Sequence, residues 1–397
     1  MTPPDAALSW VEVDAPALSD NVAGFRRLVG PDVLLAPTVK ANAYGHGTLL
    51  AARAFLAGGA DWLCVNSLDE ARVLREAGVS CPIHLIGPLP PARAAAAQAV
   101  ALDCSVVVHD AATLDALAGA ADPARPTRIH LKVETGTHRL GMPPADALAV
   151  ARRAAATPGI ELEGACSHFA DVEDTTDHRF ARSQREVFEA FLGEAAAAGI
   201  TFRLRHFSNS AAALLWPEVW YDLVRLGIGA YGMWPSNETL VTAALEGRRD
   251  AVRLRPALTW KTRVAQVRDV PAGAYVSYGR TYRCTAESRL AVLPVGYYDG
   301  YDRRLSNVAH VLVRGQRAPV RGRVCMNMVV VDVTHVPGVA VGDEAVLLGR
   351  QQDEEIPAER LAGWIGTINY EVTTRINEAA PRVASPGPAA GLPRPSS

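Results

Sequence analysis

The sequence predicts an α/β protein: a (β/α)8 barrel of the TIM type followed by a mostly β domain. From about residue 30 to residue 230, short aliphatic or β-branched runs alternate with alanine-rich helical patterns. After about residue 250, strand-like runs separated by glycine and proline turns replace this alternation. The chain has 397 residues, 49% of them hydrophobic, which is enough for two cores. We therefore expect a barrel domain over residues 8–245, a β-rich domain over 246–383 and a tail over 384–397.

Eight strand-like runs fall within the first of these domains. They are "VLLAPTV" (33–39), "WLCV" (62–65), "IHLI" (83–86), "SVVV" (105–108), "RIHLKV" (128–133), "LEGACSHF" (162–169), "FRLRHF" (202–207) and "DLVRLG" (222–227). Eight strands with helices between them favour a closed barrel, and an open doubly wound sheet is the alternative.

Helical segments follow most of these runs. The segment "SLDEARVLREAG" (67–78) opens with a capping box from Ser67 to Glu70 and closes on Gly78, which suits a left-handed cap. Helical spacing in "DHRFARSQREVFEAF" (177–191) predicts one apolar face, made by Phe180, Val187, Phe188 and Phe191.

The chain after about residue 250 has the alternation of apolar and polar residues that is typical of β-strands. In "ALTWKTRVAQVRD", Leu258, Trp260, Thr262 and Val264 alternate with Lys261 and Arg263. Further strand-like runs cover residues 289–296, 308–314, 324–333 and 344–349. The final stretch, "ASPGPAAGLPRPSS", is rich in proline, glycine and serine and predicts a disordered tail.

Composition excludes several classes of partner. The 40 basic and 42 acidic residues give a formal charge of −2 and are spread along the chain, so nothing points to nucleic acid or anionic lipid, and we expect a small-molecule partner. The six cysteines lie far apart without metal-ligand spacing and read as reduced core residues, so no metal is expected. The start "MTPPDAALSW" has no basic segment followed by an apolar stretch, and no run is apolar enough to span a membrane, which predicts a cytoplasmic protein.

Polar residues and a glycine follow the carboxyl ends of the predicted strands, where barrel enzymes carry their active sites. They are Lys40 after the first strand, Arg139 after the fifth, His168 at the end of the sixth, Asn209 and Ser210 after the seventh, and Arg225 and Gly227 at the eighth. Lys40 stands among apolar residues, where partial burial lowers the pKa of an amine and allows it to form a Schiff base. Ser210 and Gly227 follow the two strands after which barrels frequently bind a phosphate. An amine that forms a Schiff base and a phosphate site together suggest pyridoxal phosphate.

Nine segments make the chain resemble the alanine racemase family. They are "PTVKANAYGHG", "KVETGTHRLG", "SHFA", "SNSAA", "VRLGIGAYG", "VSYGRTY", "PVGYYDGY", "GRVCMNM" and "TINYEVTTRI". The resemblance covers about residues 8–383 and implies a pyridoxal-phosphate-binding barrel, a β-rich second domain and the interconversion of L- and D-alanine.

The resemblance also implies roles for individual residues. Lys40 would hold the cofactor as an internal aldimine and act as one of two proton-transfer groups, with Tyr278 as the other. Two groups are needed because inversion removes the α-proton on one face and returns a proton on the opposite face. His168 would connect Tyr278 to Arg225, and Arg225 would face the pyridine nitrogen without protonating it, which should suppress transamination.

Further positions match cofactor or substrate contacts of the family. Arg139 would contact the phenolic oxygen of the cofactor and the substrate, oriented by Lys132, which is a candidate for carbamylation. The phosphate-binding positions would be Tyr44, Ser210, Gly227, Ile228 and Tyr370. Asn209 and His168 would also contact the cofactor, and the substrate-facing positions would be Met326 and Tyr297. The sequence departs from the family pattern at Glu134, Thr137, His138 and Asn327.

The resemblance implies a symmetric homodimer in which Tyr278 and Met326 of one copy complete the site of the other, and a supply of D-alanine for peptidoglycan. Two alternatives remain at this point. The first is a racemase of other small or basic amino acids, or less readily a decarboxylase of the same fold type. The second is a protein that carries pyridoxal phosphate without turnover, but such a protein would not need a second domain that bears Tyr278.

Overall fold

The computed structural model describes residues 7–385 and divides them into two compact units. One unit combines Ala17–Ala43 with Ala51–Pro256. The other contains residues 7–16, Tyr44–Leu50 and residues 257–385. Apart from residues 384 and 385, the predicted tail lies outside the described residues. Among the described helices, none is both long and apolar enough to cross a membrane.

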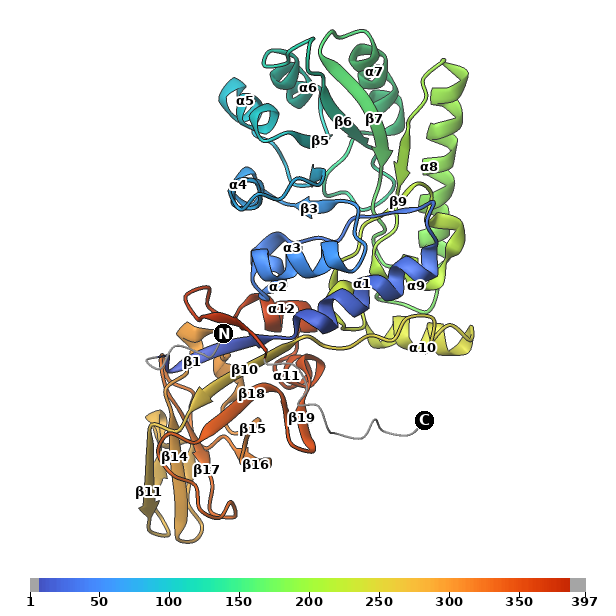
Figure 1. The fold of residues 1–397 in the computed structure, drawn as a ribbon. Helices are drawn as coiled ribbons and strands as arrows, with labels where there is room; N and C mark the ends of the chain where they lie inside the picture. The colour runs from blue at the N-terminus through green and yellow to red at the C-terminus, as the bar shows by residue number, and fades with distance from the viewer. Residues whose placement is uncertain (1–6, 386–397) are drawn as a thin grey trace. The chain divides into compact units, whose positions relative to one another are not determined.

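The first unit is built on parallel strands (Figure 1). A six-stranded sheet runs in the order β3 (Leu63–Val65), β4 (Ile83–Leu85), β5 (Cys104–Val108), β6 (Thr127–Lys132), β7 (Ile160–Cys166) and β8 (Leu204–His206). Two further strands, β2 (Leu34–Leu35) and β9 (Leu223–Val224), pair with each other.

Backbone hydrogen bonds join this pair to both edges of the six-stranded sheet. On one side Val39 N donates to Cys64 O at 2.8 Å, and on the other Asp222 N donates to Arg205 O at 3.1 Å. Because both edges are paired, the sheet closes into the predicted (β/α)8 barrel, and the open doubly wound alternative is wrong.

Helices surround the strands of this unit, and Figure 1 shows α5, α6, α7 and α8 around β5, β6 and β7. The strands β3, β4 and β5 are buried along their whole length, as strands covered on both faces must be. The helices between residues 15 and 245 are α1 (Ala15–Val29), α3 (Thr48–Ala57), α4 (Leu68–Glu76), α5 (Arg93–Ala101), α6 (Ala111–Ala118), α7 (Pro144–Ala155), α8 (Arg179–Ala197), α9 (Ser210–Leu215) and α10 (Asn237–Leu245).

The predicted start and stop signals of α4 are confirmed. Ser67 caps the helix by accepting from Glu70 N at 3.3 Å, and the Glu70 side chain accepts from Ser67 N at 3.3 Å. Gly78 follows with φ of +79°, in the left-handed region that glycine adopts without a steric penalty.

The predicted apolar face of α8 is half right. Phe188 and Phe191 are buried, but Phe180 is 46% exposed and Val187 is 38% exposed. The buried face instead runs through Ala181, Gln184, Phe188, Phe191 and Ala195, which keep the spacing of three and four residues. Phe180 and Val187 each lie one position before a member of that face, so the helix turns them away from the core.

The second unit is mostly β, as predicted. Its largest sheet runs β16 (Gln316–Pro319), β15 (His310–Val313), β18 (Glu344–Gln351), β10 (Leu258–Arg263), β1 (Ser9–Val13) and β20 (Arg382–Ala384), with β19 (Glu354–Ile356) paired to β18. A three-stranded sheet contains β11 (Gln266–Val270), β14 (Ser288–Leu293) and β17 (Val329–Asp332), and β12 (Tyr275–Val276) pairs with β13 (Tyr282–Arg283). Helices α11 (Ala358–Ile365) and α12 (Asn369–Thr374) complete the unit.

The units differ from the expected boundaries at their start. Strand β1 pairs with β10 and β20, so residues 9–13 belong to the β-rich unit although they precede the barrel in sequence. Trp10 of β1 and Trp260 of β10 are both buried in this unit. The run "ALTWKTRVAQVRD" is two strands, β10 and β11, separated at residues 264 and 265.

Candidate functional site

Lys40 follows the first barrel strand and begins a left-handed turn, Lys40–Tyr44 (α2). The four residues after it have φ between 51° and 53°, although none is glycine: Ala41, Asn42, Ala43 and Tyr44. A left-handed residue with a Cβ costs about 1–2 kcal/mol, so the surrounding structure must hold this turn. One such contact is visible, because Ala41 N donates to Glu70 Oε1 at 2.7 Å.

Glu70 therefore connects the start of α4 to the turn that carries Lys40. Its other oxygen, Oε2, accepts from Asn66 N at 2.6 Å and from Ser67 N at 3.3 Å. The capping box predicted from the sequence thus has a second role in this structure, which is to fix the backbone next to Lys40.

The Lys40 amine is half-buried, and its surroundings favour the neutral form. Burial lowers the pKa of Lys40 and Arg139 lowers it further, while Glu70 and Cys64 act in the opposite direction. A lowered pKa increases the fraction of amine that is free to attack an aldehyde at neutral pH.

Three further cationic residues lie at the same end of the barrel. Lys132 ends β6, and burial lowers its pKa to about 8 despite the nearby Cys166. Arg139 follows in an exposed loop. Arg225 follows β9 and is only 9% exposed.

His168 is neutral at physiological pH, because its pKa is lowered well below the usual value. Burial is the largest cause, and the positive charges of Lys132, Arg225, Arg139 and Lys40 add to it.

Arg225 is held by one imidazole and three carbonyl groups. It donates to His206 Nδ1, to His206 O at 3.2 Å, to Ser167 O at 2.7 Å and to Phe207 O at 3.3 Å. Within the described part of the chain, none of its hydrogen bonds goes to His168. The resemblance placed His168 between Tyr278 and Arg225. The structure also brings His206 into direct contact with Arg225, which sequence reasoning did not predict.

Ser210 lies at the same end of the barrel and is the candidate phosphate-binding hydroxyl of the site. It begins α9, whose N-cap is Asn209, because Asn209 Oδ1 accepts from Ala212 N at 2.9 Å. The Ser210 hydroxyl oxygen accepts from Gly227 N at 2.9 Å and from Gly229 N at 3.2 Å. These bonds bring together the ends of the last two barrel strands, as the sequence predicted. Ile228, between the two glycines, is fully buried.

A β-carbon at Gly229 would lie 2.9 Å from the Phe25 ring and 3.2 Å from Ser210 Cβ. Only glycine therefore allows this close approach of backbone and hydroxyl.

The remaining predicted site residues lie in the β-rich unit. Tyr44 and Tyr370 are neighbours with ring centroids 6.1 Å apart. Tyr278, Met326 and Tyr297 are exposed by 72%, 55% and 43%. Tyr278 begins a 3₁₀ turn directly after Ser277, whose φ is 62° and whose hydroxyl donates to Arg323 O at 2.6 Å. Tyr297 N donates to Cys325 O at 3.0 Å, so the Tyr297 and Met326 segments are adjacent.

Three of the positions at which the sequence departs from the family pattern lie in the loop after β6: Glu134, Thr137 and His138. Glu134 Oε1 accepts from Gly136 N at 2.5 Å, and Thr137 Oγ1 donates to His168 O at 2.7 Å. The Glu134 bond lies within the loop after β6, and the Thr137 bond ties this loop to the segment that follows β7. His138 has φ of 51° in the same loop.

The donor set in the barrel unit fits a phosphorylated aldehyde. Across the described residues, neither Arg139 nor Arg225 forms an ion pair with a carboxylate, so their guanidinium groups can interact with a bound anion. Lys40 supplies an amine with a lowered pKa, and Ser210 supplies a hydroxyl hydrogen beyond the two bonds its oxygen accepts. This combination is what pyridoxal phosphate requires.

Sequence reasoning missed four buried residues beneath this site. His84, His130 and His206 come from β4, β6 and β8, and Glu163 comes from β7. The available signal was a histidine or a glutamate within each of four predicted barrel strands, where a buried polar group demands a partner.

Comparison with known proteins identifies the family. The N-terminal domain of alanine racemase matches residues 13–235, and the C-terminal domain of alanine racemase matches residues 257–384. The alanine racemase of Desulfovibrio desulfuricans is 42% identical over 94% of this chain and 97% of its own length. That of Symbiobacterium thermophilum is 43% identical over 94% of this chain and 96% of its own length.

Solved structures agree with these matches. The alanine racemase of Streptomyces lavendulae superposes with a TM-score of 0.87 at 38% identity, covering 97% of this chain and 98% of that one. The alanine racemase of Bacillus anthracis with bound L-Ala-P gives 0.88 at 34% identity, covering 97% and 96%. The chain belongs to the alanine racemase family, whose members are isomerases that depend on pyridoxal phosphate.

Proposed function

We propose that this chain interconverts L-alanine and D-alanine with pyridoxal phosphate held on Lys40. The observation that carries the proposal is the Lys40 amine, which has a lowered pKa and lies with Lys132, Arg139 and Arg225 at the carboxyl end of a closed barrel. A relative with bound L-Ala-P supports alanine as the substrate. Incubating the purified holoenzyme with single enantiomers of alanine and other amino acids, and following the chirality of each, tests both the reaction and its substrate.

Lys40 and Tyr278 would move the protons. When bound, pyridoxal phosphate withdraws electrons from the α-carbon of an amino acid and makes its α-proton acidic. The neutral Lys40 Nζ can accept a proton on one face of the α-carbon, and the Tyr278 hydroxyl can deliver one on the other face. Neutral His168 is suited to hold Tyr278 in place, because an uncharged imidazole offers both a donor and an acceptor.

The other barrel residues would hold the cofactor. The Ser210 hydroxyl and the backbone around Gly227 and Ile228 would bind its phosphate, with Asn209 fixing the start of α9. Tyr44 and Tyr370 would contribute to the same group from their hydroxyls. Arg225 would face the pyridine nitrogen, and since a guanidinium does not give up its proton, the ring would remain close to neutral.

Lys132 would be carbamylated and would orient Arg139. Its pKa of about 8 leaves a substantial neutral fraction at physiological pH, and only a neutral amine reacts with carbon dioxide. Carbamate content measured by ¹³C NMR under labelled bicarbonate should therefore rise as the pH passes through about 8. Clear density for a free ammonium at Lys132 would contradict this assignment.

The active form would be a symmetric homodimer with shared sites. Tyr278 and Met326 are exposed by 72% and 55%, as expected for side chains that act in the site of a second copy. Mixing Lys40→Ala and Tyr278→Ala subunits should recover some activity in heterodimers, and no recovery would argue against shared sites.

We further propose that the reaction takes place in the cytoplasm, where it would supply D-alanine for peptidoglycan.

The second candidate is a racemase of other small or basic amino acids. Lys40 and Tyr278 act on the α-carbon whatever the side chain is, so selectivity must come from other residues. Asn327 follows the substrate-facing Met326 where an aspartate is common, and it removes a negative charge there. Activity on arginine or lysine equal to that on alanine would favour this second candidate.

A further inference from the structure

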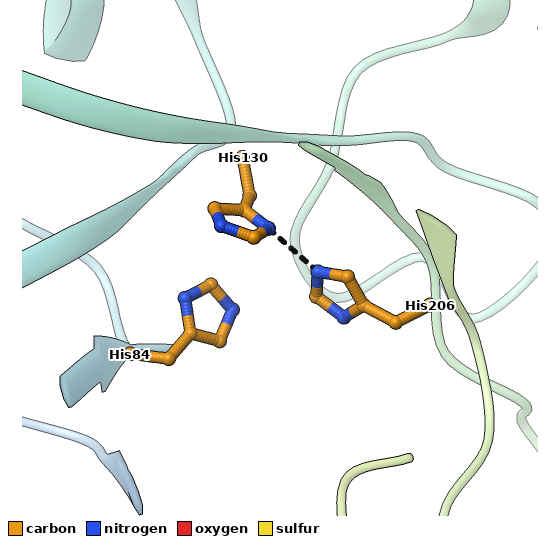
Figure 2. Close-up of side chains that lie close together, drawn as sticks. All are labelled: His84, His130 and His206. Atoms are coloured by element: carbon orange, nitrogen blue, oxygen red, sulfur yellow. Dashed lines mark hydrogen bonds between the residues drawn. The ribbon is translucent and has the colours of Figure 1, made fainter. Parts of the chain in front are cut away.

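Three histidines lie in one layer of the barrel interior. His84, His130 and His206 come from alternate strands, β4, β6 and β8, as the side chains of one barrel layer do (Figure 2). All three are almost fully buried, and one nitrogen of each ring lies within 4.8 Å of the chosen nitrogens of the other two. Branched apolar residues normally occupy such a layer, so this set of polar rings needs an explanation.

The hydrogen bonds form one chain from the site to a buried carboxylate. Arg225 donates to His206 Nδ1. His206 Nε2 lies 2.7 Å from His130 Nδ1, as the dashed line in Figure 2 shows, and His130 Nε2 lies 2.8 Å from Glu163 Oε2. Glu163 also accepts from Ser105 Oγ at 2.8 Å and pairs with Arg203. We call the chain Arg225–His206–His130–Glu163 the buried relay.

The donor at each step of the buried relay follows from its two ends. A guanidinium can only donate, so His206 Nδ1 must accept, and the single proton of the neutral ring is on Nε2. His130 Nδ1 then accepts that proton's hydrogen bond, which leaves its own proton on Nε2, directed at the Glu163 carboxylate. Every bond therefore points from Arg225 toward Glu163, and reversing any one of them would break the others.

The local fold makes room for this arrangement. Gly164 faces His130 across the β6–β7 pairing, and a β-carbon there would lie 2.4 Å from His130 Nδ1 and 2.7 Å from Leu204 O. Only glycine leaves the imidazole where it meets His206.

A metal ion fits the same three rings poorly. The two facing nitrogens of His130 and His206 share a proton, and Arg225 already uses His206 Nδ1. A cation would displace these bonds and lie close to a guanidinium.

We propose that Glu163 is a positioning residue for the racemase site: through the neutral rings of His130 and His206 it orients Arg225 and supplies its buried counter-charge. This inference deepens the proposed function and depends on it only for the role of Arg225 toward the cofactor. Without the relay, Arg225 would be a buried cation with no carboxylate in its hydrogen-bond network. Burial would raise the pKa of Glu163, but bonds from His130 and Ser105 and the charge of Arg203 lower it to about 2, so the carboxylate stays ionised.

The first test measures the protons directly. In holoenzyme labelled with [¹⁵N]histidine, two-bond ¹H–¹⁵N spectra should show His130 and His206 as neutral rings with the proton on Nε2 from pH 6 to pH 9. Either ring protonated on Nδ1 within this range would overturn the proposal. This measurement needs no turnover, so it remains valid if the proposed substrate is wrong.

The second test removes the charge and keeps the bond. In Glu163→Gln, the amide oxygen can still accept from His130 and Ser105, but the negative charge is gone. Glu161→Gln is the matched control, since Glu161 is exposed on the same strand. We expect Glu163→Gln to lower kcat by about tenfold with KM within about twofold, because the lost charge acts on the transition state and not on binding.

The same variant should shift a pH profile, which a merely structural role would not do. Removing an anion lowers the pKa of nearby cationic acids, so the acid limb of kcat/KM and the absorbance titration of the bound cofactor should move down by about half a unit or more. The other titratable groups that face the relay are His84, Cys64, Lys132, Cys166 and Arg203.

Profiles of Glu163→Gln that superimpose on those of the wild type and of Glu161→Gln would overturn the proposal. If Glu163→Gln does not fold, the ¹⁵N spectra of the wild type decide alone. Failure of the wild type to racemise alanine would instead contradict the proposed function, and the absorbance titration would still test the relay.

Discussion

The candidate catalytic groups of the two units differ in how far their own unit fixes them. Arg225 in the barrel is 9% exposed and donates to an imidazole and three carbonyls. Tyr278 in the β-rich unit is 72% exposed, although the Ser277 hydroxyl pins the backbone beside it. Folding of the barrel therefore fixes the position of Arg225. The core of the β-rich unit does not fix the Tyr278 side chain, whose partners must come from outside that core. Substitutions in the two regions should consequently separate activity from stability.

The largest expected effect is on activity alone. Tyr278→Phe should lower kcat by about 10²–10⁴-fold, the range for loss of a general acid or base. Because the side chain is mostly exposed, the free energy of unfolding should stay within about 0.5 kcal/mol of the wild type. Tyr275→Phe is the matched control, since Tyr275 is 54% exposed in the same segment and has no proposed role. Equal activity losses in the two variants would remove Tyr278 from the mechanism.

Arg225→Glu should affect both quantities. It places an acceptor against three carbonyl oxygens in a buried site, so the free energy of unfolding measured in urea should fall by about 3 kcal/mol. A carboxyl group would also protonate the pyridine nitrogen, so the ratio of transamination to racemisation should rise. An unchanged ratio in folded enzyme would contradict the role of Arg225. Arg225→Lys, which keeps the charge, is the control for folding.

A smaller effect is expected at the left-handed turn. Ala41 is exposed with φ of 53°, so Ala41→Val should lower the free energy of unfolding by about 1–2 kcal/mol through backbone strain and not through packing. Ala41→Gly removes the strain and should stay near the wild type. If valine and glycine gave the same stability, the turn would not be strained in solution.

The smallest effect is expected at the cap of α4. Ser67→Ala removes one side-chain bond of the capping box and should cost about 1 kcal/mol of stability. Glu70 keeps its bond to Ala41 N, so activity should change by less than about threefold. A much larger loss of activity would show that the cap itself holds the Lys40 turn.

The barrel was predictable because its signals are local. Each buried parallel strand appears as a short apolar run, and the residue that follows it, such as Lys40 or Ser210, is then placed at a known end of the barrel. The capping box of Ser67 and Glu70 is equally local and was found in the structure.

The features that were missed depend on contacts between distant residues. The pairing of β1 with β10 and β20 joins residues near 10 with residues near 260 and 383, which no local pattern reports. The exposure of Phe180 depends on which neighbours α8 meets, not on its own period. The buried relay needs residues of β6, β7 and β8 to meet Arg225, which follows β9, inside the barrel, and the contact between His206 and Arg225 was not predicted.

The central claim is that the Lys40 amine bonds covalently to an aldehyde cofactor. Reducing the holoenzyme with borohydride and mapping the modified peptide by mass spectrometry tests it most directly. We predict a yellow protein that carries a single phosphopyridoxyl group on Lys40. Protein that stays colourless after cofactor is added, with no adduct on Lys40 after reduction, would contradict the account.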